Sequence, residues 1–194
     1  MNYLAHIYLS EENENIQLGN FFADAVKGKS YLNFPAEMQK GILLHRKIDT
    51  FTDLHPVVKI SKARLDSSFG LYKGIIIDIF YDHFLARNWH MFSTVSLSDF
   101  ADSFYENLIR NFPILPEKIQ YLVPFLVKEN WLKSYATLGG IERVLVGMNR
   151  RTKDHSKMDL AMKDLVEHFD LLEMDFHAFF PELSAYAHSQ LLEL

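Results

Sequence analysis

Apolar residues recur along this chain three and four positions apart, the spacing that gives a helix one buried face, and no long run alternates apolar and polar residues. Prolines, serines and glycines interrupt the pattern where helices would begin or end. This pattern predicts an all-α fold in a single domain over residues 1–194, because no linker, repeat or low-complexity tract divides the chain. The expected helices span 36–53, 56–70, 96–112, 117–136, 139–150 and 157–179, and a last helix begins at Pro181.

Residues 72–89 form a further expected helix with a different pattern, because apolar residues cover most of its circumference. A helix of this kind is buried on all sides, so we expect it at the centre of the fold. Its run Ile75-Ile76-Ile77 would also suit a buried strand, but apolar residues continue beyond it at helical spacing.

The composition indicates a globular protein and excludes several other classes. Of the 194 residues, 48% are apolar and 23% are charged, which is typical of a globular chain and not of a disordered or fibrous one. The chain has no cysteine, which excludes a disulfide scaffold, a thiolate metal site and a cysteine nucleophile. No uncharged apolar run reaches the roughly 18 residues of a membrane span, and the first residues do not resemble a secretory signal. We therefore expect a soluble cytoplasmic protein without a membrane partner.

The net charge of −5 argues against a nucleic-acid partner, since phosphate neutralisation needs a basic surface. The charge is unevenly distributed, however. Residues 27–73 contain nine Lys or Arg and four acidic residues, whereas residues 158–194 contain eight acidic residues and one lysine. The basic segment suggests a substrate or partner of negative charge, and a solvated surface with chance clustering is the alternative.

Two of the expected helices carry polar residues along a stripe where a helix would normally bury apolar side chains. Within each stripe the residues lie four positions apart or next to each other: Asp78, Asp82 and His83 in one helix, and His45, Asp49 and Asp53 in the other. Buried carboxylates need a cation, hydrogen-bond donors or a metal, and helical bundles build carboxylate–histidine metal sites from facing helices. Alternatively, some of these acids pair with nearby basic residues at the surface.

Two further candidates lie near the N-terminus, where His6 and Asp24 each stand among apolar neighbours. A lone residue such as His6 is more often a hydrogen-bonded core group than a ligand. A donor set of imidazoles and carboxylates without sulfur suits Mn²⁺, Fe²⁺, Zn²⁺ or Mg²⁺, and a carboxylate-rich set favours Mn²⁺ or Mg²⁺.

The sequence contains no Gly-x-Ser-x-Gly motif and no cysteine, so a metal-activated water is the simplest nucleophile. Arg46, Lys47 and Arg64 lie near the stripes in sequence. A metal site flanked by these cations would suit a phosphate ester, because a guanidinium stabilises charge on the phosphoryl oxygens.

Four groups of residues form a specific pattern over the first 89 positions, and later segments around Gly147-Met148 and His168-Phe169-Asp170 extend it over nearly the whole chain. The four groups are Asn2-x-Leu4-Ala5-His6, Gly19-Asn20-x-x-Ala23-Asp24, Gly41-x-x-x-His45-Arg46-x-x-Asp49-x-x-Thr52-Asp53 and Asp78-x-x-x-Asp82-His83-Phe84-Leu85-x-x-x-Trp89. In this pattern the chain resembles the acyl carrier protein phosphodiesterases, which are similar to a divergent branch of the His-Asp metal phosphohydrolases.

The resemblance implies an all-α helical bundle, a metal site that favours Mn²⁺, and hydrolysis of the phosphodiester between 4′-phosphopantetheine and a serine of holo-acyl carrier protein. The products would be apo-carrier protein and free 4′-phosphopantetheine. Carrier proteins of this kind are strongly acidic, which would give the basic segment 27–73 a role as a docking surface.

The chain departs from the wider superfamily at one point, because its adjacent pair reads Asp82-His83 and not His-Asp. The ligand set is therefore assigned by spacing. The expected metal ligands are Asp24, His45, Asp78 and Asp82, with His83, Asp49 and His6 as further ligands, orienting residues or proton donors.

The remaining expected roles concern the phosphodiester itself. Arg46, with help from Lys47 or Arg64, would hold the phosphoryl oxygens, and His83 or His6 would protonate the departing serine oxygen. Two alternatives stay open at this point: a nucleotide phosphohydrolase with the same metal chemistry, and a helical module that binds carrier protein without hydrolysing it.

Overall fold

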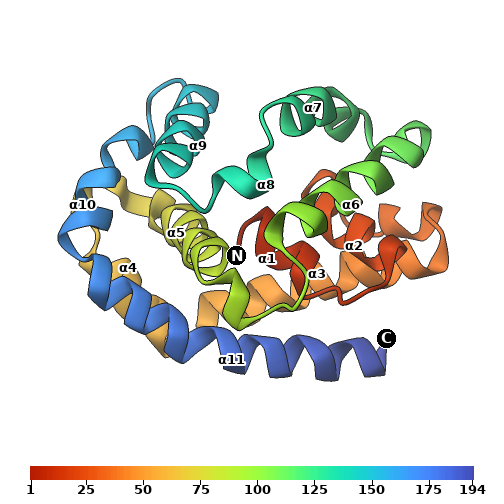
Figure 1. Cartoon of the computed structure of the whole chain (residues 1–194), viewed down its shortest axis with the longest axis horizontal. Helices are drawn as coiled ribbons and strands as arrows, with labels where there is room; N and C mark the ends of the chain where they lie inside the picture. The colour runs from red at the N-terminus through yellow and green to blue at the C-terminus, as the bar shows by residue number, and fades with distance from the viewer.

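The computed structural model describes residues 1–194 and is entirely helical, with eleven α-helices, six short 3₁₀ helices and no strand (Figure 1). The all-α prediction is therefore confirmed. The α-helices are α1 (Tyr3–Tyr8), α2 (Glu14–Phe22), α3 (Ala36–Leu54), α4 (Pro56–Arg64), α5 (Lys73–Arg87), α6 (Leu97–Arg110), α7 (Glu117–Lys128), α8 (Trp131–Ser134), α9 (Leu138–Arg151), α10 (Met162–Glu167) and α11 (Phe169–Glu193).

Helix α5 lies at the centre of the molecule, as its apolar circumference predicts. Ten of its fifteen residues are buried, and it contacts α1, α4, α9 and α11. In Figure 1, α9 lies on one side of α5 and α4 and α11 on the other. Because α5 is enclosed in this way, polar residues on it must find partners among the surrounding helices.

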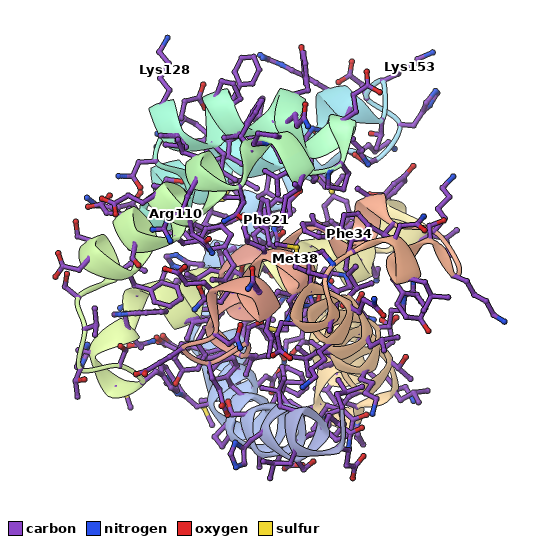
Figure 2. The ribbon with its side chains drawn as sticks, turned by 90° about the vertical axis from the view of Figure 1, so that its right-hand side faces the viewer. Phe21, Phe34, Met38, Arg110, Lys128 and Lys153 are labelled. Atoms are coloured by element: carbon purple, nitrogen blue, oxygen red, sulfur yellow. The ribbon has the colours of Figure 1, made fainter.

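Helices α2 and α3 make the most extensive contact in the fold, and two glycines allow it. A Cβ atom on Gly19 would clash with the backbone carbonyl of Met38, and one on Gly41 would clash with the backbone carbonyl of Ile16. The two backbones therefore touch directly. Figure 2 shows Phe21 of α2 and Met38 of α3 pointing into the interior beside this crossing.

The C-terminal region differs from the expected helices, because no new helix begins at Pro181. Helix α11 is continuous through this residue, although an interior proline costs about 3 kcal/mol. Phe180 and Leu183 on either side of it are fully buried, and burial of each side chain contributes roughly 1.5–3 kcal/mol. Core packing thus keeps the helix intact across the proline.

Three other expected helices are divided. The expected helix 56–70 becomes α4, which ends at Arg64, and a 3₁₀ helix over Ser67–Tyr72. The expected helix 117–136 becomes α7 and α8, separated by Asn130 in the left-handed region with φ 47°. The expected helix 157–179 is divided into a 3₁₀ turn, α10 and the first part of α11. No helix combines the length and the apolar character that a membrane crossing requires.

Candidate active site

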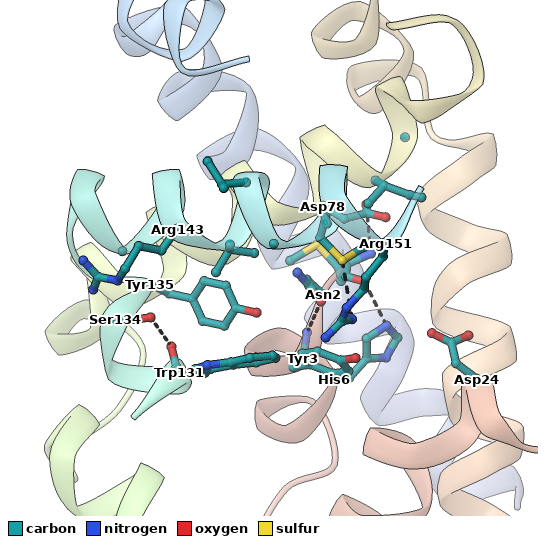
Figure 3. Close-up of a pocket in the computed structure, with 18 of the residues that line it drawn as sticks. Asn2, Tyr3, His6, Asp24, Asp78, Trp131, Ser134, Tyr135, Arg143 and Arg151 are labelled. Carbon is teal, nitrogen blue, oxygen red and sulfur yellow. Dashed lines mark hydrogen bonds and ion pairs between the residues drawn. The ribbon is translucent and has the colours of Figure 1, made fainter. Parts of the chain in front are cut away.

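A cavity of about 890 Å³ lies between two walls of the helical bundle (Figure 3). Residues from the N-terminal segment, α1 and α3 form one wall, and residues of α8 and α9 form the facing wall. Helix α5 contributes a short stretch that includes Asp78. The cavity therefore joins segments that are about a hundred residues apart in sequence.

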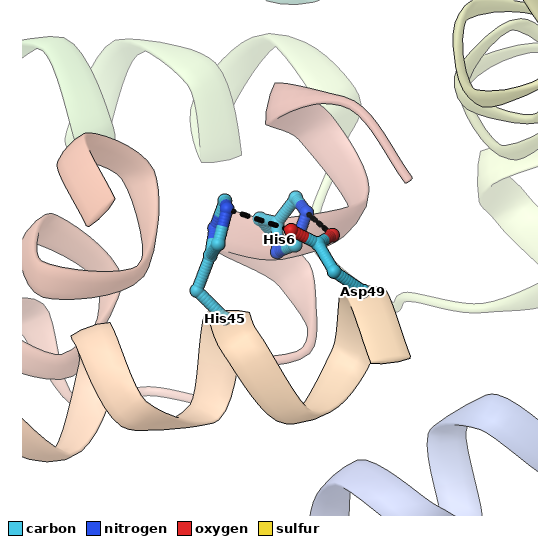
Figure 4. A group of neighbouring side chains, drawn as sticks. All are labelled: His6, His45 and Asp49. Atoms are coloured by element: carbon cyan, nitrogen blue, oxygen red, sulfur yellow. Dashed lines mark ion pairs between the residues drawn. The ribbon is translucent and has the colours of Figure 1, made fainter. Parts of the chain in front are cut away.

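His6, His45 and Asp49 meet at the first of these walls (Figure 4). The Nε2 atom of His6 lies 3.3 Å from Asp49 Oδ1, and the Nε2 atom of His45 lies 3.1 Å from Asp49 Oδ2. His45 and Asp49 share a face of α3 because they are four residues apart. The two imidazole rings stack with centroids 4.0 Å apart, so one carboxylate faces both rings.

Asn20 fixes the orientation of both imidazoles. The Nδ1–H group of His6 donates to Asn20 Oδ1 at 2.8 Å, and that of His45 donates to the Asn20 backbone carbonyl at 2.8 Å. The Asn20 amide in turn donates to the His6 carbonyl and to Ser10 Oγ. With both Nδ1 atoms engaged in this way, each Nε2 atom faces Asp49, and His6 Nε2 also lies 3.2 Å from the Met1 carbonyl oxygen.

Asp24 approaches the same cluster from the 3₁₀ turn that follows α2. Its Oδ1 atom lies 3.3 Å from His45 Nε2, while its side chain is 77% exposed at the edge of the cavity. The contact with His45 lowers the pKa of Asp24. Asp24 is therefore ionised at neutral pH and close to both histidines.

The pKa values of the two histidines in the cluster are shifted in opposite directions. Burial, together with the neighbouring His45, lowers the pKa of His6 to about 4. Burial also disfavours the charged form of His45, but the contacts with Asp24 and Asp49 outweigh it and raise the pKa of His45 to about 9. Asp49 is half-buried, which favours its neutral form, but its contacts with the two histidines outweigh this effect and lower its pKa.

The donor set fits a divalent metal ion. His45 Nε2 is buried and forms no hydrogen bond, although carboxylate oxygens of Asp24 and Asp49 lie 3.3 and 3.1 Å away. An imidazole nitrogen held between two carboxylates in this way would bind a divalent ion together with them once its proton is displaced. His6, His45 and Asp49 offer ligand atoms that all lie within 4.8 Å of one another.

Asp78 lines the cavity but stands apart from this cluster. Its Oδ1 atom lies 3.0 Å from the terminal ammonium group of Met1. Burial raises the pKa of Asp78, and the ammonium group opposes this effect. The carboxylate is thus engaged by a cation of the chain itself.

In contrast to the expectation from spacing, Asp82 and His83 lie outside the cavity. The carboxylate of Asp82 is fully buried and accepts hydrogen bonds from the backbone N–H groups of Asn2, Leu4 and Ala5, at 3.3, 2.8 and 3.3 Å. It therefore satisfies the free donors at the start of α1. His83 Nδ1 donates to the Tyr135 carbonyl at 2.7 Å.

The three cations expected to hold the substrate also point elsewhere. Arg46 donates to two backbone carbonyls in the segment 26–28, and Lys47 donates to Gln190. Arg64 forms an ion pair with Asp175 at 3.0 Å. Arg46 follows His45 directly, and one residue turns the side chain by about 100° around a helix, so it leaves the cavity face.

Sequence reasoning assigned no role to Asn20 or to a set of cavity residues on the wall opposite the cluster and beside it. Asn20 belongs to the motif Gly19-Asn20-x-x-Ala23-Asp24, and a polar residue directly before two phenylalanines indicates a buried amide. Arg151, Trp131 and Tyr3 line the cavity opposite or beside the cluster. Nothing in their sequence spacing links them to His45.

Comparison with known proteins identifies the chain's relatives. The family model described as acyl carrier protein phosphodiesterase matches residues 1–183. Proteins named acyl carrier protein phosphodiesterase from Yersinia enterocolitica, Photorhabdus laumondii and Escherichia coli are 34%, 35% and 34% identical to the chain. These matches cover 96%, 93% and 96% of this chain and 97%, 92% and 97% of the relatives. No solved structure matches the chain. The chain belongs to the acyl carrier protein phosphodiesterase family.

Proposed function

We propose that this protein hydrolyses the phosphodiester that joins 4′-phosphopantetheine to a serine of holo-acyl carrier protein. The products are apo-carrier protein and free 4′-phosphopantetheine. The observation that carries this proposal is the His6–His45–Asp49 cluster at the wall of the cavity, in a chain of this family.

The residues proposed to hold a divalent metal are His6, His45 and Asp49, with Asp24 as a fourth. The ligand atoms of His6, His45 and Asp49 all lie within 4.8 Å of one another, and Asp24 Oδ1 lies 3.3 Å from His45 Nε2. Imidazole and carboxylate donors without sulfur suit Mn²⁺, which we propose as the working metal, ahead of Mg²⁺, Fe²⁺ and Zn²⁺. A bound metal would supply Lewis-acid polarisation of a phosphoryl oxygen and a water of lowered pKa.

The chain's own residues prepare the site in two ways. Asn20 engages Nδ1 of both imidazoles, so Nε2 is the ring atom that each histidine would offer to a metal, which would displace the proton on His45 Nε2. Tyr3 lines the cavity beside the cluster, and burial raises the pKa of its hydroxyl. That hydroxyl therefore keeps its proton at neutral pH and can donate a hydrogen bond to a phosphoryl oxygen.

Asp78 and Asp82 have different roles in this proposal from those expected by spacing. Asp78 balances the ammonium group at the edge of the cavity. Asp82 supports the site indirectly, because its bonds to the start of α1 position the helix that carries His6. His83 lies outside the cavity, so proton delivery to the serine oxygen is not assigned to it.

Intact-protein mass spectrometry tests the proposal directly. Holo-acyl carrier protein is incubated with the purified protein and Mn²⁺, and a parallel sample receives EDTA. We expect the carrier protein to lose the mass of one phosphopantetheine, and EDTA to abolish the loss. Asp49→Asn should abolish it as well, whereas Asp102→Asn, an exposed change on α6, should leave it intact. An unchanged holo mass with metal-loaded wild-type protein would refute the proposed activity, and cleavage of free nucleotides instead would favour a nucleotide phosphohydrolase.

A further inference from the structure

The wall of the cavity that faces the metal cluster contains every Lys or Arg side chain that lines it. All three come from α9, and they are Arg143, Arg150 and Arg151. The rest of the lining includes six carboxylates, from both walls and from α5. A phosphodiester is an anion, so it needs a cation on this wall to offset the acidic surroundings.

Among these arginines, Arg151 is the one that reaches toward the cluster. In Figure 3 its side chain extends toward His6 and Tyr3, whereas Arg143 lies at the opposite end of the cavity beside Tyr135. The guanidinium of Arg151 is close enough to the Tyr3 hydroxyl to counteract the rise in the pKa of Tyr3 that burial causes. Its central carbon also lies 5.8 Å from the ring centroid of Trp131.

Arg151 has no carboxylate partner within 4.0 Å, although acidic residues line the same cavity. The hydrogen bond that it makes goes to the sulfur of Met148 at 3.7 Å, and a thioether is a weak acceptor. By contrast, Arg64 and Arg46 are occupied by a carboxylate and by backbone carbonyls. The planar guanidinium of Arg151 is therefore free to make paired hydrogen bonds with phosphoryl oxygens.

We propose that Arg151 binds the phosphoryl group of the substrate from the side opposite to His6, His45 and Asp49. This inference rests on the proposed function, which identifies the bound group as the phosphodiester of holo-acyl carrier protein. Arg151 holds two phosphoryl oxygens and stabilises the negative charge that grows on them as water attacks phosphorus. Tyr3, toward which Arg151 extends in Figure 3, keeps its proton and supplies a neutral donor to the same group.

Kinetics with holo-acyl carrier protein provide the first arm of the test, with three variants. Arg151→Gln should lower kcat/KM by about 10²–10³-fold, the usual cost of one lost donor to transition-state charge. Arg151→Lys should restore part of this loss, because an ammonium retains the charge but not the paired geometry. Lys153→Gln removes the same charge from a residue two positions further on that does not line the cavity, so it should match the wild type.

Calorimetric titration provides the second arm and does not depend on turnover. Metal-loaded protein is titrated with inorganic phosphate, and apoprotein is titrated with Mn²⁺. We expect Arg151→Gln to weaken phosphate binding at least tenfold and to leave Mn²⁺ binding within threefold of the wild type. Phosphate binding unaffected by Arg151→Gln, or a parallel loss of Mn²⁺ binding, would overturn the inference. If the wild-type protein binds phosphate through Arg151 but does not cleave holo-carrier protein, the proposed function is refuted, whereas the phosphate-binding role of Arg151 is retained.

Discussion

Replacement of Asn20 by alanine should weaken the fold and the metal site together. The Asn20 side chain is fully buried and makes three short hydrogen bonds, with His6 Nδ1, the His6 carbonyl and Ser10 Oγ, at 2.8, 2.8 and 2.9 Å. Each such bond contributes about 0.5–1.5 kcal/mol, and its loss leaves a buried partner unsatisfied. We therefore expect the free energy of unfolding of the metal-free protein to fall by roughly 2–4 kcal/mol.

The effect on metal binding follows from the orientation of His6. Without the Asn20 amide oxygen, nothing holds the Nδ1–H group of His6, and its ring is free to rotate or to change tautomer. Loss of a partner that orients a ligating histidine typically costs 10–100-fold in metal affinity. Urea unfolding followed by circular dichroism measures the first effect, and calorimetric titration with Mn²⁺ measures the second.

Two matched variants separate the causes. Asn20→Asp keeps an oxygen for His6 Nδ1 but cannot donate to the His6 carbonyl, so it should lose stability and keep most of its metal affinity. Asn107→Ala removes an equally buried asparagine whose amide donates to the Glu14 carbonyl at 2.9 Å, far from the cluster. It should lose stability and bind Mn²⁺ normally. If Asn20→Ala bound Mn²⁺ as tightly as Asn107→Ala, the orienting role of Asn20 would be refuted.

Three further predictions concern other parts of the structure. Asp24→Asn should weaken Mn²⁺ binding by at least 10–100-fold in calorimetry and change the unfolding free energy by less than about 0.5 kcal/mol, because the side chain is 77% exposed. Burial raises the pKa of Asp82 from 3.8 to about 7. The folded state therefore retains a proton that the unfolded chain releases, and this contribution to stability falls as the pH rises from about 4 to about 7. Asp82→Asn should flatten that part of the pH dependence of the unfolding free energy, measured by urea unfolding. An unchanged slope would contradict the raised pKa of Asp82. Gly41→Ala should lower the unfolding free energy by about 1–3 kcal/mol or more through its backbone clash, whereas Gly147→Ala, which meets open space, should be neutral or slightly stabilising in the same assay.

Sequence periodicity was sufficient for α3, α5, α6 and α9 and for the central position of α5. Periodicity was insufficient for α1, because a helix of six residues is too short to be stable alone. The backbone N–H groups at the start of α1 are satisfied by the distant carboxylate of Asp82. Periodicity also failed at Pro181, because propensity alone does not include the packing of the flanking core residues. These differences arise where long-range contacts override local preference.

In the candidate site, too, local spacing predicts some contacts, whereas others depend on long-range packing. The pairing of His45 with Asp49 follows from a spacing of four residues on one helix, and the sequence indicates it directly. A buried carboxylate such as Asp82, however, is satisfied equally well by a metal or by free backbone N–H groups. The choice depends on which element packs against it. The position of Arg151 opposite the cluster likewise depends on the contact between α5 and α9 and leaves no trace in local spacing.

The bonds from Asp82 to the start of α1 also bear on how the protein is made. The residues proposed to hold the metal, Asp24 and the His6–His45–Asp49 cluster, all precede α5 in the chain, so they leave the ribosome before it. The helix that carries His6 nevertheless depends on a carboxylate that is added some 75 residues after it. A nascent chain should therefore capture its metal tightly only after α5 has emerged, which postpones assembly of the reactive centre until the core around it can close.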